Sequence, residues 1–270
     1  MDALAYDLEK SIRKTHRKDL WVPMIEAIRR YRLLEAGDRV AVCVSGGKDS
    51  MLLAVMMQLL QKHSEFPFEV TFLAMDPGFC PENRQKLEEN ARLLSLPLTV
   101  FETDIFQTIQ SEKSPCYLCA RQRRGHLYAK AKSLGCNKIA LGHHKNDVVE
   151  TTLMGMLYGG QLQAMLPKLK SRSFPAMELI RPLYRLSESE ICAWAKECGL
   201  SFLDCACPVT KRAKEENDPA GARAQTKEWI RRMKEKNPRV EDNIFHSIHT
   251  LSPDTFPNEK NGFDAPFEEE

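Results

Sequence analysis

The sequence predicts an α/β protein with an open, mostly parallel twisted sheet, helices on both faces, and helical extensions at both ends. Two observations lead to this fold class. From residue 37 onward, short runs rich in β-branched residues alternate with longer segments of helical periodicity. The first run breaks on two glycines and resumes as a helix, which is typical of a strand–turn–helix unit. Such alternation indicates parallel strands joined by helices.

The elements follow in order along the chain. Strands are expected at 40–44, 69–75, 98–102, 138–141 and 177–181. Helices are expected at 49–62, 81–94, 119–134, 147–158 and 187–198. Residues 2–34 are also expected to be helical, because Leu4, Leu8 and Ile12 recur every four residues. The predicted organisation is an N-terminal helical segment (1–36), an α/β catalytic domain (37–205), a C-terminal helical segment (206–251) and a mobile acidic tail (252–270).

The composition and charge of the chain limit the classes of protein to which it can belong. The formal net charge is +2, but residues 252–270 carry −5, so the remainder carries +7 and suits a polyanionic partner. No apolar run approaches the ~20 residues that cross a bilayer, and the charged N-terminus argues against a signal peptide. Nine cysteines in such a chain favour metal or catalytic roles over disulfides. We therefore expect a cytoplasmic protein that does not contact membranes.

The turn after the first strand is a candidate phosphate site. It reads Ser45, Gly46, Gly47, Lys48, Asp49, Ser50. Free N–H groups at a helix N-terminus converge on anions, and glycines let the backbone approach closely. The lysine adds a positive charge and the serines add hydroxyl donors. The spacing matches neither Gly-x-x-x-x-Gly-Lys-Ser/Thr nor Gly-x-Gly-x-x-Gly. An ordinary glycine-containing turn is the alternative.

Polar residues also follow two other predicted strands. Asp76 begins an Asp-Pro-Gly turn, and Gly142, His143, His144 and Asp147 follow the strand at 138–141. Ligands bind at the carboxyl ends of parallel strands, so these groups are expected to share one cleft with the glycine turn. The alternatives are a simple turn at Asp76 and helix capping by Asp147, which is worth about 1 kcal/mol.

Three cysteines suggest a metal centre. Cys116 and Cys119 form a Cys-x-x-Cys pair just before a helix, and Cys205 follows 86 residues later in a Cys-x-Cys element with Cys207. A helix N-terminus favours thiolates. The spacing leaves three interpretations open: an iron–sulfur cluster with one iron free of protein ligands, a zinc site, or a redox dithiol.

Taken together, the motifs resemble the bacterial tRNA 2-thiocytidine synthetase family of PP-loop enzymes. They are Ser-Gly-Gly-x-Asp-Ser, Pro-Cys-x-x-Cys-x-Arg-x-Arg-Arg-Gly, Leu-Gly-His-His-x-x-Asp, Tyr-Gly-Gly and Pro-Lys-Leu. The resemblance covers about residues 20–250 in unbroken order. The chain departs from the family at Cys207, where a second Cys-x-x-Cys is usual, at Asn146, where Asp is frequent, and in the segment 208–212.

The resemblance implies cofactors and site residues. It implies ATP, Mg²⁺ and a [4Fe–4S] cluster held by Cys116, Cys119 and Cys205. The implied ATP-binding residues are Ser45, Gly46, Gly47, Lys48, Asp49, Ser50, Met75, Asp76, Gly142 and His143. Lys48, Asp49 and Asp147 would be catalytic, with Asp49 or Asp147 binding Mg²⁺. The basic residues expected to contact tRNA phosphates are Arg121, Arg123, Arg124, Lys168, Lys170 and Arg172.

The implied reaction is ATP-dependent tRNA thiolation. A base carbonyl oxygen, expected at C2 of an anticodon-loop cytidine, attacks the α-phosphorus, and sulfur then displaces AMP. The expected partners are tRNA and a sulfur donor such as a cysteine desulfurase, and a homodimer is compatible with the resemblance. One alternative is adenylation of another tRNA base or a small molecule. The other is a non-enzymatic iron–sulfur or zinc sensor that binds nucleic acid.

Overall fold

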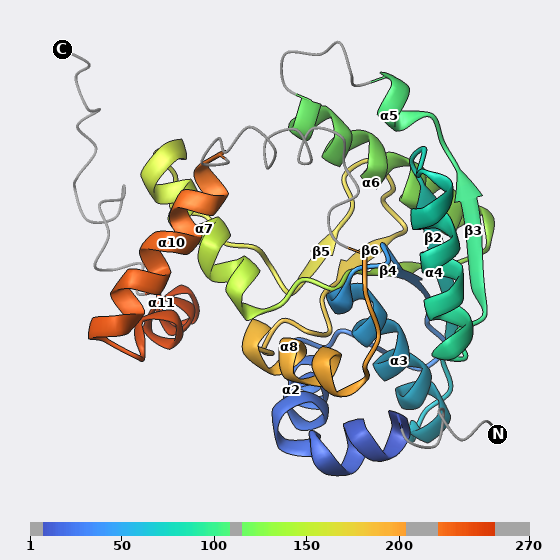
Figure 1. Ribbon diagram of the computed structural model, residues 1–270, viewed down its shortest axis with the longest axis horizontal. Helices are drawn as coiled ribbons and strands as arrows, with labels where there is room; N and C mark the ends of the chain where they lie inside the picture. The colour runs from blue at the N-terminus through green and yellow to red at the C-terminus, as the bar shows by residue number, and fades with distance from the viewer. Residues whose placement is uncertain (1–7, 109–114, 204–220, 252–270) are drawn as a thin grey trace.

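The structure is a computed structural model that describes residues 8–108, 115–203 and 221–251 (Figure 1). Side chains at 107–120 are likewise outside the description. The predicted acidic tail and both Cys205 and Cys207 therefore lie outside the described residues.

A six-stranded sheet forms the centre, in the order β3-β2-β1-β4-β6-β5. The strands are β1 (Arg39–Cys43), β2 (Glu69–Asp76), β3 (Leu98–Glu102), β4 (Lys138–Ala140), β5 (Lys168–Lys170) and β6 (Glu178–Ile180). All neighbouring pairs are parallel except β5 with β6, which is antiparallel. The predicted fold class is confirmed, and the predicted strands agree with β1–β4 and β6 to within one residue.

Helices connect the strands as predicted. They are α2 (Val22–Arg30), α3 (Lys48–His63), α4 (Pro81–Leu93), α5 (Ile105–Thr108), α6 (Pro115–Ser133), α7 (Lys145–Gly159), α8 (Glu188–Glu197), α10 (Gly221–Lys236) and α11 (Val240–His249). Two short π-helical turns, η1 (Ser11–Thr15) and η2 (Arg17–Trp21), precede α2. Within the described ranges, no helix combines the length and apolarity needed to span a membrane.

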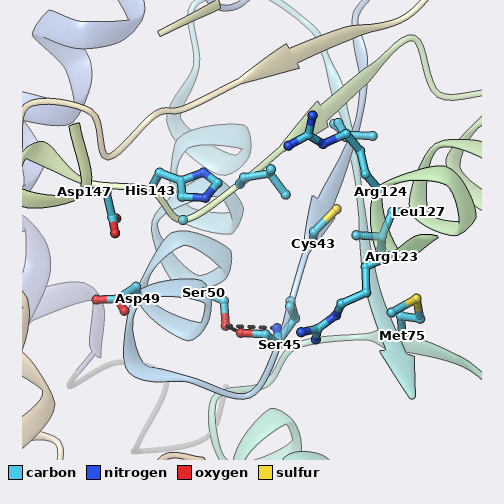
Figure 2. Close-up of a pocket in the computed structure, with 14 residues that line it drawn as sticks. Cys43, Ser45, Asp49, Ser50, Met75, Arg123, Arg124, Leu127, His143 and Asp147 are labelled. Atoms are coloured by element: carbon cyan, nitrogen blue, oxygen red, sulfur yellow. Dashed lines mark hydrogen bonds between the residues drawn. The ribbon is translucent and has the colours of Figure 1, made fainter. Parts of the chain in front are cut away.

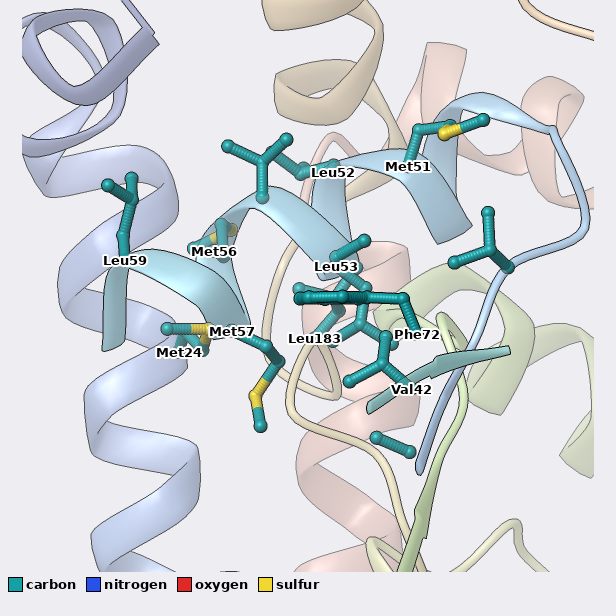
Figure 3. Close-up of a cluster of buried hydrophobic side chains, with 14 of the residues drawn as sticks. Met24, Val42, Met51, Leu52, Leu53, Met56, Met57, Leu59, Phe72 and Leu183 are labelled. Carbon is teal, nitrogen blue, oxygen red and sulfur yellow. The ribbon is translucent and has the colours of Figure 1, made fainter. Parts of the chain in front are cut away.

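Alternate residues of β1 enter two different cores, because successive strand side chains point to opposite faces. Val40 and Val42 pack in the larger core with residues of α2, α3 and α8. Figure 3 shows Val42 and Phe72 of the sheet facing the apolar side of α3. Ala41 and Cys43 face the smaller core, to which α6 contributes Tyr128. Helices therefore cover both faces of the sheet.

The order of the strands indicates where a ligand would bind. β1 lies between β2 and β4, so the chain leaves β1 toward one edge of the sheet and later returns to its other side. Such a switch point leaves a crevice at the carboxyl ends of the two strands. Residues 44–47 follow β1 and residues 141–144 follow β4, so both predicted motifs border this crevice.

Candidate active site

A cavity of about 420 Å³ opens at the switch point between β1 and β4 (Figure 2). Its lining residues are Cys43, Val44, Ser45, Asp49, Ser50, Met75, Arg123, Arg124, Leu127, Ile139, Leu141, Gly142, His143 and Asp147. In Figure 2, His143 and Asp147 stand on one side of the cavity and the two α6 arginines on the other. The structure therefore joins the glycine turn, the end of β4 and α6 around one space large enough for a small-molecule ligand.

The glycine turn is held in shape by its own hydroxyl groups. The Ser50 hydroxyl accepts the Ser45 backbone N–H at 3.0 Å and donates to the Gly47 carbonyl at 2.9 Å. Gly46 has a φ of +86°, a backbone conformation that favours glycine. A Cβ at Gly46 would lie 2.5 Å from the Leu203 side chain, and Leu203 donates its N–H to the Gly46 carbonyl at 2.9 Å. Both turn shape and tertiary packing thus require glycine at position 46.

Lys48 and Asp49 begin α3 as an ion pair. Lys48 Nζ lies 3.1 Å from Asp49 Oδ1 and 3.4 Å from Glu188 Oε1 of α8. Burial alone would lower the pKa of Lys48, but the charges of Asp49 and Glu188 raise it above its ordinary value. Asp49 lines the cavity, whereas Lys48 stands beside the lining residues and is held by the two carboxylates.

His143 is kept neutral by its surroundings. Burial and the positive charge of Arg181 lower the pKa of His143 to about 4. The Arg181 Nε–H donates to His143 Nδ1 at 3.3 Å, which assigns the proton of the neutral ring to Nε2. Arg181 itself follows β6, is buried, and also donates to the Leu166 carbonyl. His143 therefore offers an N–H donor among the residues that line the cavity.

Asp147 both caps a helix and lines the cavity. Its Oδ2 accepts the His144 backbone N–H at 3.0 Å, in a capping box at the start of α7. Burial alone would raise the pKa of the Asp147 carboxyl. The His144 ring, the hydrogen bond from the His144 backbone N–H and the charge of Arg223 together lower this pKa below the usual range. His144 Nε2 lies 3.8 Å from Asp49 Oδ1 and 3.5 Å from Asp147 Oδ2, so one imidazole faces both carboxylates.

Two of the implied ATP-binding residues, Met75 and Asp76 at the end of β2, have different surroundings. Met75 lines the cavity. The Asp76 carboxylate instead accepts the Phe79 N–H at 2.7 Å and the Gly78 N–H at 2.9 Å, and Arg84 Nη1 lies 2.9 Å away. Burial alone would raise the pKa of Asp76, but these donors lower it. Its described contacts fit the turn interpretation, and it is not among the cavity-lining residues.

Helix α6 connects the cavity to the predicted metal centre. Arg123 and Arg124 line the cavity, while Cys116 and Cys119 lie in the first turns of the same helix. Leu203, packed on the glycine turn, is the last described residue before Cys205. Within the described ranges, no group of three His, Cys, Asp or Glu side chains is arranged to hold a metal ion.

The predicted tRNA-contacting residues lie in three kinds of place: at the cavity, in an ion pair on β5, and exposed on the surface. Arg123 and Arg124 belong to the cavity, as stated above. Lys168 lies on β5, where its Nζ is 3.0 Å from Glu178 Oε2 and donates to the Arg32 carbonyl. The remaining three basic residues are exposed: Arg121, Lys170 and Arg172.

Comparison with known proteins identifies the family. The PP-loop domain family matches residues 23–207. The tRNA-cytidine(32) 2-sulfurtransferase of Alkalilimnicola ehrlichii is 37% identical over 247 residues, which cover 89% of this chain and 75% of the relative. The chain belongs to the PP-loop 2-sulfurtransferase family. The corresponding sulfurtransferase of Syntrophotalea carbinolica is 34% identical over 84% of this chain and 87% of its own length. The resemblance found in the sequence is confirmed.

A solved structure supports the PP-loop fold independently. The U34-tRNA thiolase NcsA from Methanococcus maripaludis, solved with its [4Fe-4S] cluster, has a TM-score of 0.64 to this chain. The alignment covers 86% of this chain and 79% of that one, at 18% sequence identity. At this identity, the likeness concerns the fold.

Sequence reasoning missed two arginines of the site. Arg181 donates to His143 and could have been found, because it is the last residue of the strand predicted at 177–181, at the ligand-binding edge. Arg223 contacts Asp147 from a helix 76 residues later, and no pattern in the sequence marks it.

Proposed function

We propose that this PP-loop protein is an ATP-dependent tRNA sulfurtransferase that replaces the C2 oxygen of cytidine 32 in the anticodon loop with sulfur. One observation carries the proposal. The glycine turn, His143 with Asp147, and the α6 arginines line a single cavity, in a chain more than 30% identical to 2-sulfurtransferases of that specificity.

The glycine turn is suited to the ATP phosphates. The N-terminus of α3 supplies backbone N–H donors at residues 47–50, and the cavity adds the positive charges of Arg123 and Arg124. The close approach of a phosphate is consistent with glycine at positions 46 and 47. Met75 is one of the apolar residues that line the cavity and offers a surface against which an adenine ring could pack.

Asp49 and Asp147 fit a magnesium ion by their chemistry. Both carboxylates line the cavity, both face the His144 ring, and ionised oxygens are the ligands that Mg²⁺ takes. Bound there, Mg²⁺ would neutralise charge on the departing pyrophosphate. The low pKa of the Asp147 carboxyl keeps it ionised at neutral pH, as this role requires.

The chain's residues would then promote adenylation of the base. The cytidine C2 oxygen attacks the α-phosphorus, the bond to the β-phosphate oxygen breaks, and pyrophosphate leaves with AMP bonded to the base. The neutral His143 can donate its Nε2–H to a phosphate oxygen, and Arg123 and Arg124 can balance the negative charge that develops. Attack of sulfur on C2 expels AMP.

Three cysteines are proposed to hold a [4Fe–4S] cluster next to this site. Cys116 and Cys119 are close in α6, whose next turns carry the cavity arginines, and Cys205 follows Leu203 by two residues. A cluster held by three cysteines would leave one iron without a protein ligand and would supply sulfur for transfer. We further propose a cytoplasmic location, a sulfur donor such as a cysteine desulfurase, and a homodimer.

Mass spectrometry of tRNA nucleosides tests the proposal. Cells that lack this protein should lose 2-thiocytidine, and expression of the wild-type chain should restore it, while an Asp147→Asn variant should not. Loss of a different thionucleoside would support the alternative base substrate. An unchanged nucleoside profile would contradict thiolation and favour the sensor interpretation.

A further inference from the structure

Helix α10 reaches the active-site helix α7 through one arginine. Arg223, in the first turn of α10, places Nη1 3.2 Å from Asp147 Oδ1 and 3.5 Å from Glu150 Oε2. Its Nη2 donates to Thr151 Oγ1 at 3.4 Å. Figure 1 shows α10 running beside α7. The Arg223 side chain is 51% exposed, so it covers these groups from the solvent side.

Arg223 lies beside two carboxylates at this end of the cavity. Asp49 and Asp147 line the cavity, and Glu150 lies one helical turn after Asp147 with only 6% of its surface exposed. The cation of the glycine turn, Lys48, is already shared between Asp49 and Glu188. An anionic triphosphate that enters the cavity therefore meets two carboxylates, Asp49 and Asp147. Arg223 contacts Asp147 and, beside it, Glu150.

We propose that Arg223 is a positioning residue for the nucleotide. Its guanidinium neutralises Asp147 and Glu150 and fixes the Asp147 carboxylate at the cavity, so that the ATP phosphates can bind beside it. The inference rests on the proposed function, since it assumes that ATP occupies this cavity. It gives α10, a helix outside the matched PP-loop domain, a direct part in nucleotide binding.

The charge of Arg223 is expected to matter more than its shape. One hydrogen-bonding nitrogen, Nη1, contacts both carboxylates, so a lysine can preserve much of the neutralisation. Removal of the charge would leave the buried Glu150 with Lys227 as its remaining nearby cation. Because the Arg223 site is half-exposed, the effect of its charge on a bound anion should shrink as the salt concentration rises.

The experiment measures the Kd of a non-hydrolysable ATP analogue, with Mg²⁺, by calorimetry on the full chain. Arg223→Gln should weaken binding about tenfold at low salt, and Arg223→Lys should stay within about threefold of wild type. Arg231→Gln is the matched control. Arg231 lies on the same helix and also bridges two carboxylates, Glu228 and Glu235, and its loss should leave the Kd unchanged.

A double variant separates charge from structure. In the Arg223→Gln background, Glu150→Gln should recover part of the lost affinity, because it removes one of the two carboxylate charges that Arg223 balances. Unchanged binding by Arg223→Gln, or no recovery in the double variant, would overturn the inference. Because this assay contains no tRNA, wild-type protein that binds the analogue but does not thiolate tRNA would overturn the proposed function and leave the Arg223 result intact.

Discussion

The two sides of the cavity are built in different ways. The glycine-turn side takes its shape mainly from its own residues, because short-range hydrogen bonds fix the backbone and hydroxyls of residues 45–50, and Leu203 packs against Gly46. The α7 side is assembled from distant elements, because His143 depends on Arg181 of the β6 end and Asp147 on Arg223 of α10. Ligand binding at the glycine turn should therefore respond most to changes of backbone shape, and the function of the α7 side should respond most to changes of charge. The following predictions test this difference.

The largest effect is expected from Gly46→Ala. The φ of +86° is unfavourable for alanine, and the added Cβ would collide with Leu203. The strain and the collision together should raise the Kd of an ATP analogue, measured by calorimetry, about 1,000-fold, which corresponds to ~4 kcal/mol. Gly37→Ala is the control, since Gly37 has a φ of +85° but open space around its Cβ position. Equal losses of binding in both variants would show that backbone strain alone is responsible, and not the contact between residue 46 of the glycine turn and Leu203.

Asp147→Asn should act on turnover rather than on folding. Asparagine can still cap α7, so the unfolding free energy should change by less than about 1 kcal/mol. Loss of the carboxylate charge at the proposed magnesium site should lower tRNA-dependent pyrophosphate release about 100-fold. Glu190→Gln, which removes the equivalent capping-box acid at the start of α8, controls for capping. If Asp147→Asn released pyrophosphate at the wild-type rate, Asp147 would have only the capping role.

A smaller, pH-dependent effect should come from His143. The folded pKa is about 4, whereas the unfolded value is about 6.5, so the unfolded chain binds the extra proton between these values. Stability should therefore fall as pH drops through this window, by about 2 kcal/mol between pH 7.5 and pH 5. Urea unfolding of His143→Gln should lack this contribution, while the exposed His126→Gln should keep it. Identical pH profiles for wild type and His143→Gln would refute the buried neutral histidine.

The same difference explains what the sequence could predict. The glycine turn, the strand ends and most element boundaries depend on neighbouring residues, so periodicity and turn chemistry located them. Arg223 approaches Asp147 through tertiary packing of α10 on α7, which local patterns do not encode. The antiparallel edge strand β5 is not predicted, because Leu169 stands alone between two lysines, whereas the equally short β4 and β6 contain consecutive apolar residues. The carboxylate of Asp76 holds its own turn, and its expected place in the ATP site stays a prediction.

The most direct test of the central claim is a reaction of purified, cluster-loaded protein with ATP, Mg²⁺, sulfide and an unmodified tRNA transcript. Pyrophosphate release and the modified nucleotide are measured together, the latter by mass spectrometry of mapped fragments. We predict tRNA-dependent pyrophosphate release and 2-thiocytidine at position 32, both absent when that cytidine is replaced by uridine. Sulfur incorporation without ATP, or pyrophosphate release that is independent of tRNA, would contradict the account.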